Sequence, residues 1–378
     1  MRDEAPPDLT PEDLARRHAL YSQIEAYVQP YLARNPRAKR AVDALFPSQS
    51  SDPDEDGGVQ FTTPPSRVWD HLAFRSFDCV DGGLRAVARV FEKHGYTYRG
   101  SLTFREKKVD AAWFAPPDAP WARDAFGDPL FPRLFVSHLR VADLADDKAK
   151  AVIVERVSVK RKDDDDVNAT NDDAVVVAER GGVPWREKKL SLDEYETVSR
   201  ASEYAAWTLI NGHALNHVAV PVHRLFVDEF ANQKQKQTKT DEACGPRRRF
   251  ASLETCLAFL RSPPFSLPLS NAGGGEVKVS PDGGLRQAST VADDVEFEFC
   301  SSHGANGDEA EAKTKTKSRR VPASYVEFVD RLPTENSGGQ NGHHVPERLL
   351  RDGFETANAD AIFESTFRAQ RAAGLGAS

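Results

Sequence analysis

The chain has few cysteines, and their spacing suggests neither a disulfide framework nor a thiolate metal site. Among its 378 residues are Cys79, Cys244, Cys256 and Cys300, which form no Cys-x-x-Cys pair. Small secreted folds and thiolate zinc sites both rely on closely spaced cysteines. The pattern therefore favours reduced thiols in an intracellular protein.

Long apolar runs are also missing. No stretch approaches the roughly 18 apolar residues that indicate a membrane span, and the acidic start from Met1 to Glu4 lacks the apolar core of a targeting peptide. We therefore expect an intracellular soluble protein that is not attached to a membrane. The composition leaves the compartment open between the cytoplasm and an organelle such as a plastid.

An excess of positive charge is absent as well. The 50 lysines and arginines are outnumbered by 58 acidic residues, which gives a formal net charge of −8 and a pI near 5.8. Nucleic acids and anionic membranes are bound largely through a basic field. The charge thus argues against both as partners and favours a small metabolite or a protein partner, while the oligomeric state stays open.

Residues 1–60 predict an N-terminal helical segment. The sequence Thr10-Pro11-Glu12-Asp13 combines an N-cap residue, a proline at the first helical position and acid in the first turn. We expect this helix to run to about Ala33 and a second helix to cover residues 38–45. The run 47–58 is rich in Ser, Asp, Pro and Gly, which is typical of a loop.

Residues 61–145 predict one β-α-β-β-β unit. Alternating residues indicate an opening strand over 70–77, and helical spacing follows over 84–92. Further alternation predicts strands over 96–105, 107–114 and 132–140.

A helical connector is expected over residues 146–212. A helix is predicted from about residue 142 to 157, followed by a charged low-complexity insertion at 160–173 that we expect to be a solvated loop. Its aspartates lack the glycine and the final glutamate of a calcium loop. From Ser191 the pattern is helical again until Asn211-Gly212.

The same order of elements then recurs over residues 213–335, before a C-terminal segment at 336–378. Residue patterns predict a strand at 216–222, helices around 227–230 and 252–260, strands at 276–280 and 285–290, and a closing strand at 324–331. Loop insertions are expected at 232–249 and 301–320.

The opening strand places a metal-ligand residue and a carboxylate-binding residue on one face. The two-residue period of a strand sends His71, Ala73 and Arg75 to one side. The Cα atoms of His71 and Arg75 then lie about 13 Å apart. A small dicarboxylate fits between two such side chains.

The repeated order suggests pseudo-symmetry, with the first and last strands of each unit as equivalents. This matches His71 and His138 of the first unit with His217 and Glu327 of the second. Two histidines and one carboxylate form the ligand set that holds non-haem Fe(II) with open positions, and zinc or manganese also accepts it.

These residues resemble the DUF1338 family of the vicinal oxygen chelate superfamily, whose characterised members are 2-oxoadipate dioxygenase/decarboxylases. The resemblance extends from about residue 65 to 366. Its stretches are HLAFRSF (71–77), VDAAWFAPP (109–117), PRLFVSHLRV (132–141), EYAAWTLINGHALNHVAV (203–220), LRQAST (285–290), YVEFVDR (325–331) and GFETANADAIFEST (353–366).

The resemblance implies an α+β fold in which two vicinal-oxygen-chelate-like β-α-β-β-β units surround a central metal site, with N-terminal helices added. It assigns the Fe(II) ligands to His71, His217 and Glu327 and the substrate-binding arginine to Arg75. The implied reaction converts 2-oxoadipate and O2 into 2-hydroxyglutarate and CO2, a step of lysine degradation.

Four further residues carry open alternatives. Gln287 and Ser289 share a strand face, so they either bind the oxoacid or serve only the strand ladder. His138 is a fourth ligand or a hydrogen-bond partner of one. His213 lies four residues before His217, a spacing that on a helix would let the pair bind one metal, but Gly212 interrupts the helix just before His213, which disfavours a shared metal.

Two other functions remain compatible with the sequence. The metal site would suit another dioxygenase, which acts on a different 2-oxoacid or cleaves a ring, and the fold would suit a non-catalytic metabolite-binding or plastid-development factor. Arg75 favours a substrate with a second carboxylate. The intact set of His71, His217 and Glu327 favours catalysis.

Overall fold

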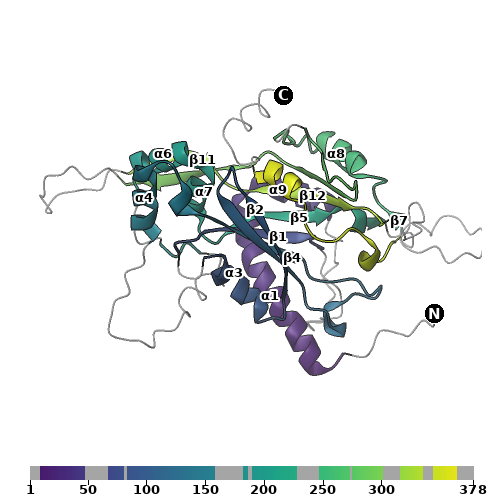
Figure 1. Ribbon diagram of the computed structural model, residues 1–378. Helices are drawn as coiled ribbons and strands as arrows, with labels where there is room; N and C mark the ends of the chain where they lie inside the picture. The colour runs from purple at the N-terminus through teal and green to yellow at the C-terminus, as the bar shows by residue number, and fades with distance from the viewer. Residues whose placement is uncertain are drawn as a thin grey trace, which may run out of the picture.

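A curled eight-stranded sheet forms the centre of the protein (Figure 1). The computed structural model describes residues 9–46, 67–80, 83–157, 182–185, 190–227, 247–272, 275–300, 316–334 and 344–363. The strand order is β2-β3-β4-β1-β5-β12-β9-β8. The strands are β1 (His71–Phe77), β2 (Thr97–Phe104), β3 (Val109–Ala115), β4 (Arg133–Leu139), β5 (Leu215–Pro221), β8 (Lys278–Val279), β9 (Leu285–Ser289) and β12 (Tyr325–Arg331).

The sheet consists of two halves with the same topology. The first half follows β1, the helix α3 (Leu84–Glu92), β2, β3 and β4; the second follows β5, the helix α8 (Leu253–Arg261), β8, β9 and β12. In each half the first and last strands pair in parallel, and β1 and β5 join the halves as antiparallel neighbours. The predicted pair of β-α-β-β-β units is confirmed.

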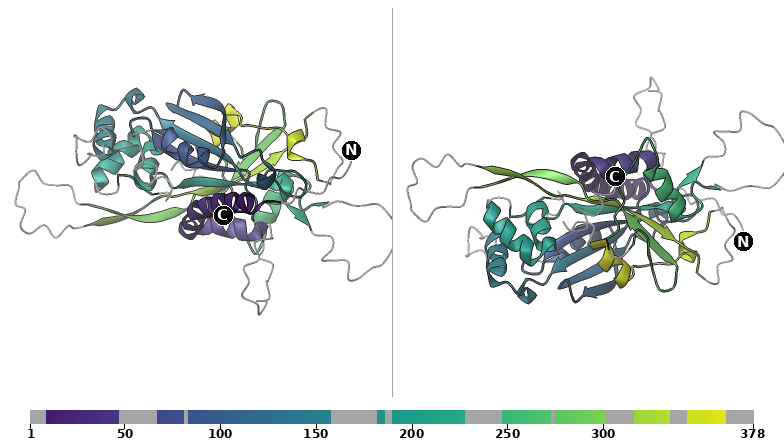
Figure 2. Two further views of the ribbon diagram at one scale, coloured as in Figure 1. Left: turned by 90° about the horizontal axis from the view of Figure 1, so that it is seen from below. Right: turned by 90° about the horizontal axis from the view of Figure 1, so that it is seen from above.

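The N-terminal helices cover one face of the sheet, opposite α9 (Figure 2). They are α1 (Pro11–Arg34) and α2 (Pro36–Leu45), and Thr10, the predicted N-cap residue of α1, forms a capping box with Asp13. Their apolar residues share a core with Leu72 and Phe74 of β1. Because successive side chains of a strand alternate, His71 and Arg75 lie on the other face.

That other face is partly covered by a second group of helices. They are α4 (Asp147–Val157), α6 (Leu192–Ala201), α7 (Glu203–Asn211) and the C-terminal α9 (Thr356–Phe363). Ala73 and Phe77 of β1 pack into this second core. Helix α9 contacts β2 of one half and β8 and β9 of the other, so it bridges the two ends of the sheet.

Smaller elements complete the described chain. A hairpin of β10 (Asp294–Phe299) and β11 (Lys317–Pro322) extends beside α6, and β6 (Phe226–Val227) pairs with β7 (Arg247–Arg248). The 3-10 turns are η1 (Pro120–Ala122), η2 (Val141–Asp143), η3 (Val222–Arg224) and η5 (Glu347–Leu349).

Several sequence predictions were wrong in detail. The helix expected over 227–230 was wrong at its first residue, because Val227 belongs to the short strand β6. Residues 228–230 lie outside the described residues. The loop expected over 301–320 ends in β11, where Arg320 lies opposite Glu296 and the opposite charges support pairing. The helical tract from Ser191 divides into α6 and α7 because the Ser202 side chain caps a new helix by accepting from the Ala205 amide.

Other predicted boundaries shift by a few residues. The connector helix begins at Asp147 after the turn η2, and the strand expected over 276–280 contains only residues 278 and 279. The predicted loops at 47–58 and 160–173 and most of the insertions at 232–249 and 301–320 lie outside the described residues. None of the helices described is both long and apolar enough to cross a membrane.

Candidate metal centre and substrate site

Two histidines meet where the halves of the sheet join. His71 begins β1 and His217 lies in β5, where it is the ladder partner of Ala73. Both side chains therefore point to the same face, and their Nε2 atoms are 3.2 Å apart. The two rings cross nearly edge to face and are almost completely buried.

Glu327 completes a triad from the neighbouring strand. In the parallel pairing of β12 with β5, Tyr325 lies opposite His217 and Glu327 opposite Ala219, so Glu327 shares the face of His217. Its Oε2 atom is 3.1 Å from Nε2 of His217 and 3.6 Å from Nε2 of His71. One ligand atom from each of the three buried residues falls within a single small volume.

Each triad residue has a hydrogen-bond partner on the side away from this volume, and these bonds leave three lone pairs directed into it. Nδ1 of His71 is 2.8 Å from Oδ1 of Asp70, and Nδ1 of His217 is 3.0 Å from Oδ1 of Asn216. Both oxygens are acceptors, so each Nδ1 carries the proton and each Nε2 keeps a lone pair. Gln287 donates through Nε2 to Oε1 of Glu327 at 2.6 Å, which leaves Oε2 available. Such converging acceptors fit a cation.

The electrostatics agree with a metal-binding donor set. Burial alone would raise the pKa of Glu327, but His71 and His217 lower it to about 2, so the carboxylate is ionised. Burial lowers the pKa of His217 to about 4, which keeps this imidazole neutral at pH 7. Burial also opposes the charge on His71, yet Glu327 and Asp70 outweigh it and raise the pKa of His71. A cation at this site would therefore bind His71 in competition with a proton.

An ion pair with Arg331 fixes Asp70, the hydrogen-bond partner of His71. Arg331, from the end of β12, donates from Nε and Nη2 to the two carboxylate oxygens of Asp70 at 2.6 and 2.9 Å. The same guanidinium donates to the backbone oxygens of Arg351 and Gly353. The neighbouring Phe354 ring packs edge-on against His71 at 4.9 Å. The C-terminal segment therefore contributes one wall of the site.

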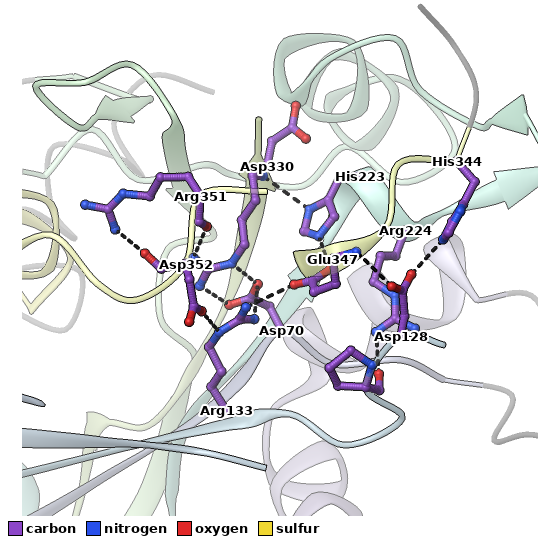
Figure 3. A network of polar contacts seen from close by, with 12 residues as sticks. Asp70, Asp128, Arg133, His223, Arg224, Asp330, His344, Glu347, Arg351 and Asp352 are labelled. Atoms are coloured by element: carbon purple, nitrogen blue, oxygen red, sulfur yellow. Dashed lines mark hydrogen bonds and ion pairs between the residues drawn. The ribbon is translucent and has the colours of Figure 1, made fainter. Parts of the chain in front are cut away.

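A second cluster of ligand-type residues is an ion-pair network rather than a metal site (Figure 3). Carboxylate and imidazole atoms of Asp70, His223 and Glu347 also lie close together. Glu347, however, accepts from Arg133 at 3.1 Å and lies 3.2 Å from Nε2 of His223. Because arginines already neutralise these carboxylates, the cluster has little negative charge left for a cation.

Arg75 lies on the face of the triad, inside a shell of aromatic rings. Its side chain is 1% exposed. The guanidinium carbon is 4.8 Å from the centre of the Tyr204 ring and 5.1 Å from that of Trp207. The centre of the Phe363 ring of α9 lies 5.5 Å from the same guanidinium carbon. Burial lowers the pKa of Arg75, but a guanidinium stays charged at neutral pH.

Gln287 and Ser289 of β9 lie beside Glu327. Ser289 is the ladder partner of Glu327 and Gln287 that of Val329, so both share the face of the triad. Gln287 binds the ligand-type carboxylate, while its own Oε1 is buried without a hydrogen-bond partner among the described residues. The geometry therefore gives Gln287 an orienting contact that the sequence did not suggest.

The predicted equivalence of His138 with Glu327 was wrong. The registers pair Ala73 with Phe135 in the first half and Ala219 with Glu327 in the second, so the equivalent of Glu327 is Phe135. His138 is the ladder partner of Ser76 and points to the opposite face from His71. His213 is also off the triad, with its Nε2 3.2 Å from Oγ of Ser76.

Comparison with known proteins identifies the family. The family model described as 2-oxoadipate dioxygenase/decarboxylase matches residues 24–337. The chain belongs to this family. A chloroplastic 2-oxoadipate dioxygenase/decarboxylase of Arabidopsis thaliana is 35% identical over 342 residues, which cover 90% of this chain and 75% of the relative. A chloroplastic/amyloplastic one of Oryza sativa is 35% identical over 339 residues, with 89% and 75% covered.

Solved structures agree with the family assignment. The hydroxyglutarate synthase of Oryza sativa in complex with 2-oxoadipate has a TM-score of 0.69 and 32% identity, with 98% of each chain covered. A structure described as a glyoxalase superfamily protein of Ralstonia eutropha has a TM-score of 0.50 and 19% identity, with 88% of each chain covered. The second likeness concerns the fold alone and fits the two-unit architecture.

Several residues around the site of this family member were not predicted. Asp70 and Asn216 each directly precede a ligand-type histidine, and this repeated acceptor-histidine pair was a signal available in the sequence. Tyr325, two residues before Glu327, was also detectable from strand alternation. The aromatic shell of Arg75 and the wall formed by Phe354 come from distant segments, so local patterns gave no indication of them.

Proposed function

We propose that the protein catalyses the Fe(II)-dependent oxidative decarboxylation of 2-oxoadipate with O2 to 2-hydroxyglutarate and CO2, a reaction of lysine degradation. The observation that carries the proposal is the shared face of the buried triad His71, His217 and Glu327 and the buried cation Arg75. The relatives named above supply the identity of the oxoacid.

The triad supports the choice of iron. Two neutral imidazoles and one carboxylate are the protein ligands typical of non-haem Fe(II) oxygenases. When bound, Fe(II) supplies open positions for an oxoacid and O2 and the electron that starts O2 reduction. Asp70, Asn216 and Gln287 hold the three ligands in orientation through hydrogen bonds.

The remaining residues bind and enclose the substrate. Arg75 pairs with the distal carboxylate of 2-oxoadipate through two parallel hydrogen bonds, which selects both charge and chain length. Ser289, beside Glu327, faces the same space. Phe354 packs against His71 and Phe135, and this apolar wall excludes water from the reacting end.

The test measures gas uptake and product together. Protein reconstituted with Fe(II) without air is expected to consume one O2 and form one 2-hydroxyglutarate and one CO2 for each 2-oxoadipate added. The His217→Ala variant, which lacks one ligand, is expected to retain little iron and to show no uptake. Iron-loaded wild-type protein that consumes no O2 with 2-oxoadipate would reject the proposed function.

A further inference from the structure

Tyr325 occupies a central position in the site, although the proposed mechanism has not used it. It begins β12, lies opposite His217 in the ladder and precedes Glu327 by two residues on the same face. Its ring stacks on His217 with the centres 4.7 Å apart and an interplanar angle of 27°. This stacking and the contact of its backbone oxygen with the Tyr31 hydroxyl fix the orientation of the residue.

The hydroxyl group of Tyr325 is what requires explanation. The residue is 0% exposed, and its hydroxyl has no hydrogen-bond partner among the described residues. The ring itself packs well, within a small cluster that includes Ala292 and Ile362 of α9. A buried hydroxyl without a partner costs free energy, so phenylalanine would suit a purely structural role better.

The surroundings indicate which ligand would satisfy this hydroxyl. Tyr325 stacks on His217 and shares the strand face of Glu327, and its phenol is close enough to the Arg75 guanidinium for the two groups to interact electrostatically. A phenol keeps its proton at neutral pH, so this hydroxyl can donate a hydrogen bond. The other tyrosine beside Arg75 is already engaged, because the Tyr204 hydroxyl is 2.9 Å from Oγ of Ser137.

We propose that Tyr325 is a specificity-determining residue whose hydroxyl donates a hydrogen bond to the same distal carboxylate that Arg75 binds. This inference rests on the proposed function for the identity of the substrate. The two residues would form a carboxylate clamp, with the cation supplying charge and the phenol fixing the distance from the triad. A mono-carboxylate oxoacid would leave the clamp empty.

The experiment compares wild-type protein, Tyr325→Phe and Tyr96→Phe. Tyr96 is the matched control, since its buried hydroxyl donates to the Pro132 backbone oxygen at 2.8 Å within the core on the opposite face of the sheet. Each protein is loaded with Fe(II) without air, its iron content is measured, and the Kd values for 2-oxoadipate and 2-oxohexanoate are determined by calorimetry.

The expected result separates the two acids. Tyr325→Phe is expected to keep its iron and its Tm. It should bind 2-oxoadipate at least roughly tenfold more weakly, because it loses a hydrogen bond to a charged group. Its affinity for 2-oxohexanoate should equal that of the wild type. Tyr96→Phe is expected to lose Tm and to keep both affinities.

Three other outcomes overturn the inference. Equal weakening for both acids would place the hydroxyl at the shared oxoacid end, and unchanged affinity would remove it from binding. Loss of iron or of folding in Tyr325→Phe would show that the residue supports His217 or the core. Wild-type protein that binds 2-oxoadipate selectively without consuming O2 would reject the proposed function and leave the clamp to be decided by the variant.

Discussion

Arg75 carries a permanent charge in a place from which water is nearly excluded. Its guanidinium contacts the faces of Tyr204 and Trp207, and these rings stabilise the cation without neutralising it. Aromatic faces carry no formal charge, so these contacts leave the side chain cationic. Under the proposed function, this cation is what distinguishes a site for dicarboxylates from other uses of the same candidate metal-binding triad.

Substitution of Arg75 is expected to affect dicarboxylate turnover selectively. Arg75→Ala should lower kcat/KM for 2-oxoadipate by at least about thirtyfold, because hydrogen bonds between charged groups contribute about 2 kcal/mol or more. Arg75→Lys should also fail, since it keeps the charge but loses the paired geometry. Steady-state assays with iron quantified in each preparation measure the effect.

The control for Arg75 is the chain-matched mono-carboxylate. Turnover of 2-oxohexanoate should change much less than that of 2-oxoadipate in both variants. Equal losses on the two acids would mean that Arg75 shapes β1 or positions a ligand, and the dicarboxylate assignment would lose its structural support.

Asn216 is expected to control metal affinity from outside the ligand set. Its Oδ1 accepts the Nδ1 proton of His217, so Asn216→Ala should weaken metal binding roughly 10- to 100-fold by freeing the ring orientation. Competition with a chelator measures the affinity. Asn211→Ala is the matched control, because that buried amide bonds Trp207 and Arg34 instead. Equal losses in the two variants would indicate general destabilisation.

The Asp70–Arg331 pair links three separate parts of the chain. It joins the start of β1 to the end of β12, and Arg331 also binds backbone oxygens of the C-terminal segment. Both side chains are buried. Breaking one partner of a buried pair leaves an uncompensated charge, which is strongly destabilising.

Arg331→Met is therefore expected to lower the free energy of unfolding by about 3–5 kcal/mol. Urea denaturation of metal-free protein measures this change. The control is Arg286→Met, which removes a surface pair with Glu254 and should cost no more than about 1 kcal/mol. A loss in Arg331→Met no larger than that of the control would show that Arg133, 3.5 Å from Asp70, compensates.

The elements with strong periodicity were predictable from the sequence, and those defined by long-range pairing were not. Strand β1 and helix α3 occur where alternation and helical spacing place them. The hairpin of β10 and β11 was missed because half of the residues of β11 are charged and its strand state depends on its partner. The contribution of α9 to the site depends on the curl of the sheet, which no local pattern encodes.

The same limit explains the error at His138. Its spacing in the sequence suggested a ligand position, but strand register decides which face a residue occupies, and a shift of one residue reverses that face. For His71, His217 and Glu327 the register does put all three on one face, and the resemblance to the family had named the same three residues by their motifs.

Acid is expected to destabilise the metal-free protein. Burial would raise the pKa of Asp70, but Arg331 lowers it well below its ordinary value. Burial would also raise the pKa of Glu347, but His223 and Arg133 lower it. Groups with a depressed folded pKa stabilise fully above the unfolded pKa, near 4. They lose that contribution progressively as the pH falls from there to the folded pKa, so the loss begins in the interval around pH 4.

The urea midpoint should therefore fall steadily between about pH 5 and pH 3. Arg331→Met should show a shallower fall, because Asp70 then loses the main cause of its low pKa. A midpoint that stays constant or rises over this interval would contradict the network of buried carboxylates shown in Figure 3.

The presence of Phe135 in one half and Glu327 in the other, at equivalent positions, has a consequence for the metal. A carboxylate at both positions would offer a cation four protein ligands, which is enough to complete a tetrahedral site. In this chain only the second half supplies a carboxylate there. The asymmetry between the halves would therefore leave a bound metal with positions open to small molecules, which is the condition for chemistry at the metal.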